Sequence, residues 1–254
     1  MSRHRFHIPA ENWNPEALSL GSDEAQHCAE VLRCKPGDRV TVFDGRGAEA
    51  IAEISSIDSG AQTVRLKLVA ANKTSRPPAF LTLGQAIPKG KNMDLIVQKA
   101  TELGASQIAP LLSERTVVKL DQREAEKKQA KWQKVALEAC KQCGQNWLPE
   151  ILPIQSVEQF LASHAGQKTG TVGLQLIAAL HPDAQPLKTI LDETYPGSRP
   201  CTATVLIGPE GDFTPAELAT AMTDGFLPLS LGPIVLRSET AAIYALSVLG
   251  HELM

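Results

Sequence analysis

The sequence contains no apolar segment long enough to cross a membrane, and aromatic residues make up only 4% of the chain. Its N-terminal stretch, MSRHRFHIPAENW, lacks the apolar core that a signal peptide requires. Cysteine is scarce as well, and five cysteines, an odd number, indicate reduced thiols and not a disulfide framework. With 43% hydrophobic and 21% charged residues, the composition predicts a soluble globular protein of the cytoplasm, with no membrane contact.

Several common catalytic motifs are also missing. No G-x-G-x-x-G follows a predicted strand, and Lys89-Gly90-Lys91 does not form a Walker A motif because no Ser or Thr follows it. H-E-x-x-H and G-x-S-x-G are absent, which argues against a zinc protease and an α/β-hydrolase. Cys140 and Cys143 form a C-x-x-C, but no second pair or histidine cluster completes a metal site, so we predict core residues and no metal.

The net charge of −3 is unevenly distributed. Residues 1–72 hold 8 Lys and Arg against 10 Asp and Glu (−2), residues 73–150 hold 13 against 8 (+5), and residues 151–254 hold 4 against 10 (−6). Only the middle segment is basic, so a polyanionic partner is expected to bind there. A solvated helix face is the alternative for the four lysines between Lys127 and Lys134.

The first part of the chain reads as a small β-barrel-like domain, residues 1–72. β-branched or alternating residues predict strands at 39–43, 49–54 and 63–68, and one helix is expected from Ser22, as N-cap, to Leu32. A linker at 73–79 ends in Pro77-Pro78, which can continue neither strand nor helix.

From residue 80 to 254 the pattern changes to strands that alternate with helices, which predicts an α/β domain with a mostly parallel sheet. The apolar runs at 171–178 and 202–207 are typical of central strands buried on both faces. Helices are expected at 92–103, with Gly104 as C-cap, and at 122–143. Two capping boxes, Ser156 with Gln159 and Thr214 with Glu217, mark further helix starts.

Near the C-terminus, Leu229 to Leu246 (LSLGPIVLRSETAAIYAL) reads as strand, short loop and helix. A similar strand end, Ile207-Gly208-Pro209-Glu210-Gly211, precedes it, and Leu180-His181-Pro182 is a third candidate. Gly and Pro shape such loops so that backbone groups face a ligand, and apolar neighbours can enclose an adenine ring. Ordinary strand-to-helix turns, with Ser238 and Glu239 as helix caps, are the alternative interpretation.

The stretches PKGKNMDLIVQKATELG, LLSERTVVKL, EACKQCGQN, LIGPEGDFTPAE and LGPIVLRSETAA, in this order, resemble the bacterial 16S rRNA uridine-N3 methyltransferases (RsmE type), of the SPOUT or α/β-knot class. The resemblance covers essentially the whole chain. It implies a PUA-like N-terminal barrel, a C-terminal trefoil knot that holds S-adenosylmethionine, a homodimer, and 16S rRNA in the assembled small ribosomal subunit as substrate. General topology rules would argue against a knot.

Together, the loops and the resemblance predict cofactor contacts, mostly from backbone, at the loop around Leu180 and at 207–211 and 231–236. The individual candidates are Leu180, His181, Ile207, Gly208, Pro209, Glu210, Gly211, Leu231, Gly232, Leu236, Ser238 and Thr240. Phosphate contacts to RNA are expected from seven cations: Arg5, Arg33, Lys89, Lys91, Arg115, Lys119 and Lys141.

The chemistry of the implied reaction selects Arg237 and Glu239 as candidate catalytic residues. Uridine N3 carries a proton, so the site needs a proton acceptor and a cation that stabilises negative charge on the uracil carbonyls. Arg237 is the candidate cation, and Glu239 either accepts the proton through water, orients Arg237 or merely caps the last helix. Glu114 and Arg115 are reserve candidates.

Three positions depart from the family's usual pattern. Asp212 stands where a second glycine usually follows Gly211, which puts a side chain and a negative charge at the cofactor loop. Ile234 replaces an arginine, and Gln145 replaces the arginine that follows Cys-Gly. Asp212 and Ile234 keep open an RNA-binding or assembly factor with lost turnover. A SPOUT enzyme that acts on a ribose 2′-hydroxyl or another base is a third hypothesis.

Overall fold

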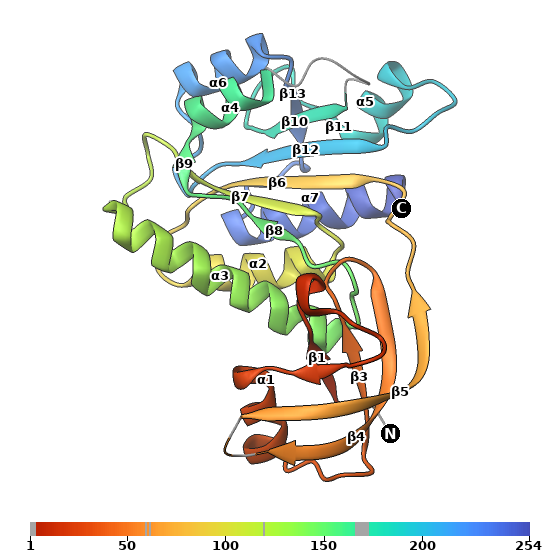
Figure 1. The fold of residues 1–254 in the computed structure, drawn as a ribbon. Coiled ribbons are helices and arrows are strands. Elements are labelled where there is room, and N and C mark those ends of the chain that lie inside the picture. The colour runs from red at the N-terminus through yellow and green to blue at the C-terminus, as the bar shows by residue number, and fades with distance from the viewer. Residues whose placement is uncertain (1–3, 59, 61, 119, 166–172) are drawn as a thin grey trace. The chain divides into compact units, whose positions relative to one another are not determined.

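The computed structural model describes residues 4–58, 60, 62–118, 120–165 and 173–254, and the chain divides into two compact units (Figure 1). Unit 1 comprises Met1–Arg76 and Leu137–Leu148, and unit 2 comprises Pro77–Ala136 and Pro149–Met254. Residues 137–148, which the sequence analysis places in the second domain, therefore belong to unit 1. No helix in the described part of the chain is long and apolar enough to span a bilayer.

Unit 1 is built on a five-stranded sheet in the order β1-β3-β4-β5-β2. The three predicted strands are confirmed, two of them in longer form. The strands are β1 (Arg5–His7), β2 (Ser19–Leu20), β3 (Arg39–Phe43), β4 (Ala48–Asp58) and β5 (Thr63–Lys73). Phe6, Leu20, Val42 and Ile54 are among its buried core residues.

The expected helix of unit 1 is present but differs in detail. It runs as an α-helix over α1 (Ser22–Gln26) and continues as a π-helical segment, η2 (His27–Val31). Ser22 is not the N-cap as predicted. Gly21 takes that position in an extended conformation, which makes Ser22 the first helical residue, with no side-chain capping bond.

Unit 2 contains an eight-stranded sheet in which every pairing is parallel, so the predicted parallel α/β architecture is confirmed. Seven strands follow the order β11-β13-β10-β12-β6-β7-β8, and β9 also pairs with β7. Their bounds are β6 (Phe80–Ala86), β7 (Gln107–Leu112), β8 (Glu150–Ile151), β9 (Gln155–Ser156), β10 (Leu174–Ala178), β11 (Gln185–Pro186), β12 (Thr202–Ile207) and β13 (Leu227–Ser230). Residues 171 and 172 of the predicted strand lie outside the described residues.

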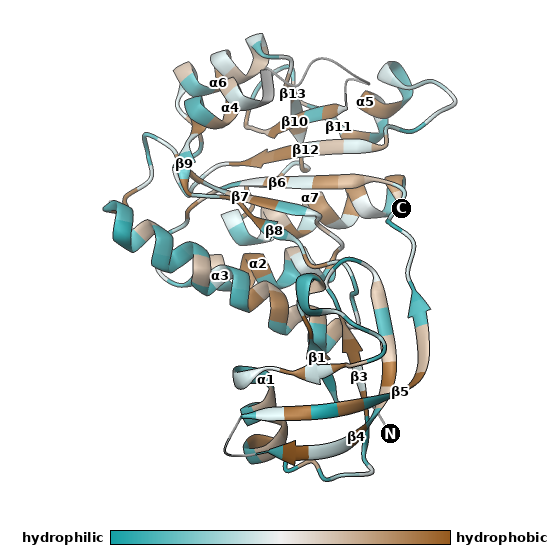
Figure 2. Ribbon diagram, viewed as in Figure 1, coloured by the Kyte–Doolittle hydropathy of each residue, from teal (hydrophilic) through white to brown (hydrophobic). Residues whose placement is uncertain are grey.

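Helices cover both faces of this sheet: α4 and α6 pack together on one face, and α2 and α7 on the other (Figure 1). Apolar residues concentrate in the central strands, where both faces are covered (Figure 2). The helices are α2 (Asn92–Glu102), α3 (Gln122–Cys143), α4 (Val157–Ala165), α5 (Leu187–Thr194), α6 (Pro215–Thr223) and α7 (Ser238–Leu253).

Local sequence signals set several helix ends. Ser156 and Gln159 exchange side-chain and backbone hydrogen bonds, as do Thr214 and Glu217, so both predicted capping boxes are confirmed. The C-cap of α2 is Leu103 and not Gly104, which follows it with a φ of 82°. Glycine adopts that left-handed conformation without the cost a side chain would add.

Candidate functional site

A cavity of about 310 Å³ lies at the carboxyl ends of three neighbouring strands, β10, β12 and β13. Parallel pairing aligns these ends, because Ala178 is in register with both Ile207 and Leu229. The segments that follow the three strands therefore meet at one edge of the sheet. This is where open α/β sheets bind ligands, and sequence analysis had assigned all three loops to it.

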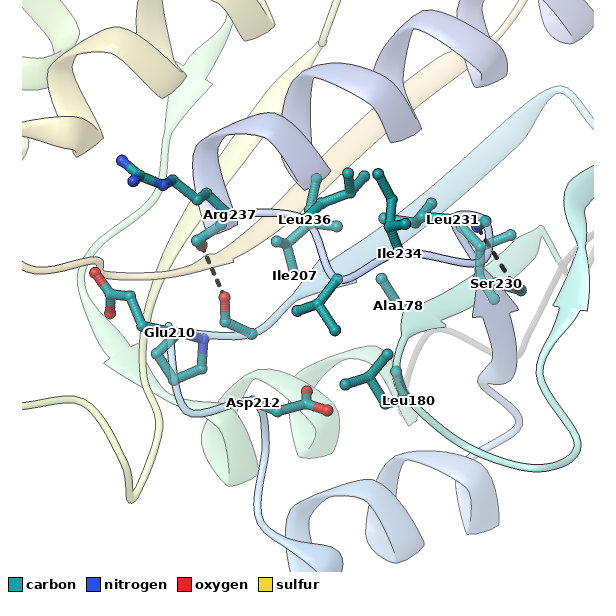
Figure 3. A pocket seen from close by; sticks show the side chains of 18 residues that line it. Ala178, Leu180, Ile207, Glu210, Asp212, Ser230, Leu231, Ile234, Leu236 and Arg237 are labelled. Atoms are coloured by element: carbon teal, nitrogen blue, oxygen red, sulfur yellow. Dashed lines mark hydrogen bonds between the residues drawn. The ribbon is translucent and has the colours of Figure 1, made fainter.

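The lining of the cavity is mostly apolar, with Arg237 and Glu210 toward one end, the Asp212 carboxylate beside Leu180, and Ser230 near Leu231 (Figure 3). Figure 3 shows the Arg237 guanidinium extending away from the apolar side chains of Leu231 and Ile234, toward the end where Glu210 lies. The lining residues are Ala178, Ala179, Leu180, Ile207, Gly208, Pro209, Glu210, Asp212, Leu229, Ser230, Leu231, Gly232, Ile234, Val235, Leu236, Arg237, Ser238 and Ala241. Such a lining suits a ligand with a flat apolar part and a charged part.

Two glycines let the backbone form the cavity wall. Gly232 has a φ of 117°, a conformation that a residue with a side chain rarely adopts. A Cβ on Gly208 would lie 3.1 Å from Asp212 Oδ1 and 3.2 Å from the Phe213 backbone nitrogen. At both positions, glycine is needed for conformation or for close packing.

Neighbouring loops of unit 2 anchor the segment 208–214. The Glu210 carboxylate accepts a hydrogen bond from the Lys89 backbone N–H at 3.0 Å, and the Arg115 guanidinium donates to the Gly211 carbonyl at 2.6 Å. The Glu217 carboxylate accepts from Ser113 Oγ and from the Glu114 and Thr214 backbone N–H groups. The segment is thus held from the loops after β6 and β7.

Asp212 lies in this segment with a φ of 62°, a left-handed conformation that is uncommon for a residue other than glycine. Its Oδ1 accepts a hydrogen bond from the Phe213 N–H at 2.8 Å, and its own N–H donates to the Pro209 carbonyl at 2.9 Å. These two bonds offset the conformational cost, because short polar side chains tolerate this region by bonding locally. Asp212 therefore adds a carboxylate to the cavity lining.

The two catalytic candidates are adjacent to the cavity but differ in placement. Arg237 lines it, is exposed, and occupies the N-cap position of α7 without a side-chain capping bond. Glu239 is half-buried in the first turn of α7 and is not among the lining residues. No ion pair or hydrogen bond joins Arg237 to Glu239 or to any other side chain in the described part of the chain. The guanidinium is thus free to bind a ligand.

Most of the predicted cofactor residues are brought together in this cavity. Three of the twelve cofactor candidates do not line it: His181, Gly211 and Thr240. Ile234 and Val235 lie within the predicted range 231–236. Sequence reasoning placed the Asp212 side chain at the cofactor loop but missed the following lining residues: Ala178, Ala179, Leu229, Ser230 and Ala241. Except for Ala241 they are the last residues of strands or follow them directly, so extending each strand-end loop backward would have found them.

The predicted RNA-binding cations differ in availability. The Arg5 guanidinium donates to Glu49 and to Asn146, each at 2.7 Å, and its side chain is only 14% exposed. The Lys141 ammonium, 13% exposed, lies 2.5 Å from Glu24 and 2.9 Å from Glu138. Arg33, Lys89, Lys91 and Arg115 are exposed, and Lys119 lies outside the described residues.

Comparison with known proteins gives consistent matches over the chain. Residues 75–250 match the model of an RNA methyltransferase domain, and residues 20–67 match that of an RNA methyltransferase PUA domain. Ribosomal RNA small subunit methyltransferase E of Bacillus subtilis is 30% identical over 92% of this chain and 90% of its own length. The corresponding Synechocystis protein is 31% identical over 96% of this chain and 76% of its own length.

Two solved structures have the same fold over nearly the whole chain. A ribosomal RNA small subunit methyltransferase E from Neisseria gonorrhoeae, bound to S-adenosyl methionine, superposes with a TM-score of 0.84 at 30% identity, covering 99% of this chain and 98% of its own. A Legionella pneumophila methyltransferase in complex with the cofactor SAM has the same TM-score at 36% identity, with the same coverage.

Proposed function

The chain belongs to the RNA methyltransferase family that includes ribosomal RNA small subunit methyltransferase E, and we propose that it transfers a methyl group from S-adenosylmethionine to N3 of a uridine in 16S rRNA. The observation that carries this proposal is the cavity at the ends of β10, β12 and β13, which combines backbone-lined loops, an apolar lining and one exposed guanidinium. The substrate is the rRNA of the small ribosomal subunit, and the cytoplasm is the expected compartment.

The cavity fits the proposed cofactor in size and chemistry. Its volume of about 310 Å³ is at the lower end of the range for small-molecule sites. Leu180, Leu231 and Ile234 supply apolar surface for an adenine ring, and the backbone around Gly208 and Gly232 supplies donors and acceptors for its edge. Glu210 and Asp212 supply carboxylates for the cationic part of the molecule.

S-adenosylmethionine supplies a methyl group on a positively charged sulfur, and the residues of the chain prepare the acceptor nitrogen. Uridine N3 is a poor nucleophile while it carries its proton. Loss of the proton frees a lone pair on N3 and spreads the negative charge onto the carbonyl oxygens. Arg237, which is exposed at the end of the cavity where Glu210 lies, is placed to stabilise that charge. Glu239 would take the proton through a water molecule, or else only favour the α7 N-terminus by its charge.

We also propose that the C-terminal part of the chain forms a trefoil knot and that the protein is a homodimer. Ser238 Oγ donates to the Gly208 carbonyl at 2.8 Å, so the segment before α7 lies against the segment after β12, as the crossing loops of a trefoil knot would. Leu180, Ile234 and Val235 are 71%, 69% and 75% exposed beside the cavity. Such an apolar surface supports a homodimer whose interface lies next to the cofactor.

RNA binding is proposed for the PUA-like unit and for the basic loops of unit 2. The exposed cations Arg33, Lys89, Lys91 and Arg115 are the main candidates. Arg5 and Lys141 are weaker candidates, because a phosphate would have to displace their carboxylate partners.

We expect affinity for small-subunit rRNA to fall steeply as salt rises, because phosphate contacts release counterions. Lys89→Ala and Lys91→Ala should each flatten the slope of log K against log salt by roughly one unit. Lys188→Ala, on an exposed position of α5 in the acidic C-terminal region, is the matched control and should leave the slope unchanged. Filter binding over a salt series measures all three, and a salt-independent affinity would contradict the proposal.

A second candidate function follows from two observed side chains. Asp212 adds a carboxylate to the cavity, and Ile234 is an exposed apolar residue where the family usually has arginine. An rRNA-binding assembly factor with weak or lost turnover would tolerate both. A SPOUT enzyme that methylates a ribose or another base is the third possibility.

Methyl transfer to undermethylated small ribosomal subunits distinguishes these functions. We expect radiolabel from S-adenosylmethionine to enter 16S rRNA and mass spectrometry to locate it on a uracil N3. Calorimetry with S-adenosylmethionine measures cofactor binding in parallel. An assembly factor that has lost turnover would still bind RNA but would incorporate no label. Label on a ribose or on another base would support the third function and refute uracil N3 as target.

A further inference from the structure

A buried glutamine outside the cavity is hydrogen bonded to its wall. Gln85 lies in β6, is 0% exposed, and is not one of the lining residues. Its Nε2 donates to Ser238 Oγ at 2.9 Å and to the Ala86 carbonyl at 2.8 Å. Ser238 Oγ in turn donates to the Gly208 carbonyl at 2.8 Å, a bond drawn in Figure 3.

The direction of these bonds is determined by their chemistry. The Ala86 carbonyl can only accept, so the nitrogen of the Gln85 amide must face it, and the same nitrogen reaches Ser238. The Ser238 hydroxyl has a single hydrogen, which it gives to Gly208, so it can only accept from Gln85. Gln85 therefore donates to Ser238, and Ser238 donates to the Gly208 carbonyl, in a one-way chain of hydrogen bonds that we call the relay.

The relay links the central sheet to both walls of the cavity. Gly208 begins the segment after β12, and Ser238 is the first residue of α7, directly after Arg237. Ser238 is itself 5% exposed, so neither of its bonds competes strongly with water. The Ser238 hydroxyl thus joins the Gly208 wall to the α7 N-terminus, and the Gln85 amide holds that hydroxyl from β6.

We propose that Gln85 is a positioning residue: through Ser238 it fixes the spacing of the two cavity walls and, with it, the place of Arg237. The identity of the ligand in this inference rests on the proposed function. A purely structural glutamine would contribute to stability alone. The Gln85 Oε1 atom supports the positioning role: it is buried and no donor among the described residues reaches it, so half of the amide adds a desolvation cost with no bond in return. A site that needed only packing would be better filled by an apolar side chain.

Three variants interrupt the relay, two at Gln85 and one at Ser238. Gln85→Met keeps the approximate volume and removes the donor, Ser238→Ala removes the middle member, and Gln85→Glu keeps the shape but replaces the amide donor with a carboxylate. Thr101→Val is the matched control, because Thr101 is also buried and its hydroxyl donates to Val97 within α2. The control loses a buried hydroxyl bond that has no connection to the cavity.

We expect Gln85→Met and Ser238→Ala each to weaken S-adenosylmethionine binding by about tenfold in calorimetry, the order of one lost buried hydrogen bond. Because the bonds act in series, the double variant should bind no more than about twofold more weakly than Ser238→Ala. Gln85→Glu should bind as weakly as Gln85→Met, and Ser238→Thr, which keeps a hydroxyl, should recover most of the affinity. Thr101→Val should bind like the wild type even if its thermal midpoint falls.

The outcomes separate the relay from the proposed function. Wild-type protein that binds no S-adenosylmethionine would overturn the proposed function. Wild-type protein that binds it, with Gln85→Met and Ser238→Ala binding equally well, would overturn the relay alone. If Gln85→Met does not fold, as far-ultraviolet circular dichroism would reveal, Gln85→Glu takes its place, because Ser238 lines the cavity and its variants could also act by direct contact; wild-type affinity in Gln85→Glu would overturn the relay. Multiplicative losses in the double variant would also refute a series arrangement.

Discussion

Arg237→Ala is expected to lower the rate of methyl transfer by about a hundredfold to a thousandfold, the effect of removing one charge-stabilising donor from an active site. Affinity for S-adenosylmethionine should change little, because Arg237 lies at the end of the cavity near Glu210 and its guanidinium points away from Leu231 and Ile234 (Figure 3). The rate falls and the affinity does not, because the guanidinium stabilises negative charge that develops only as the uracil proton leaves. Single-turnover transfer to small subunits, alongside calorimetry, measures the two effects separately.

Two further variants define the role of Arg237 more closely. Arg237→Lys keeps the charge but loses the planar pair of donors, so partial activity would show that charge alone supplies part of the effect. Glu239→Gln tests the proton acceptor, and wild-type turnover there would leave Glu239 as a charge at the helix N-terminus. Arg237→Ala protein that methylates at the wild-type rate would remove this residue from the mechanism.

Gly232→Val should abolish detectable S-adenosylmethionine binding while the protein remains folded. A β-branched residue at a φ of 117° is strongly disfavoured, so the loop must move, and this loop supplies part of the cavity wall. Gly208→Leu should have the same result for a different reason, because a Cβ would lie 3.1 Å from Asp212 Oδ1 and 3.3 Å from Asp212 Cα. We expect affinity losses of at least about a hundredfold in both, a few kilocalories per mole.

Gly197→Val is the matched control for Gly232→Val. Gly197 also has a positive φ, 74°, and nothing lies within 4 Å of the place where its Cβ would be, but it does not line the cavity. The Gly197→Val protein should lose stability through the same backbone strain and keep its affinity for S-adenosylmethionine. Unchanged binding in Gly232→Val or Gly208→Leu would contradict the assignment of the cavity.

Much of the fold could be predicted because its signals are local. The apolar run at 202–207 and the capping box of Thr214 with Glu217 act within a few residues, and both appear in the structure as predicted. Ser22 was misplaced by one position because a serine and a glycine at neighbouring positions are both acceptable N-caps. Local signals leave such choices open.

The site was predicted only in part. Gly-Pro strand ends marked the loops correctly, since glycine and proline limit the backbone wherever they occur. Whether a given side chain faces the cavity depends on the final packing, and here His181, Gly211 and Thr240 were expected to contact the cofactor but do not line the cavity. Asp212 was recognised as a departure from the family pattern that puts a side chain at the cofactor loop, but its left-handed backbone conformation was not foreseen.

The alternation of strands and helices and the glycines of the loops were enough to indicate a parallel α/β domain with a ligand site at its strand ends. Interactions between residues far apart in sequence were decided by the tertiary structure alone. Gln85 and Ser238 are 153 positions apart, and Arg5 and Asn146 are 141 apart. No periodicity or local motif encodes such pairs, because their energy is gained only after chain folding has brought both partners out of water.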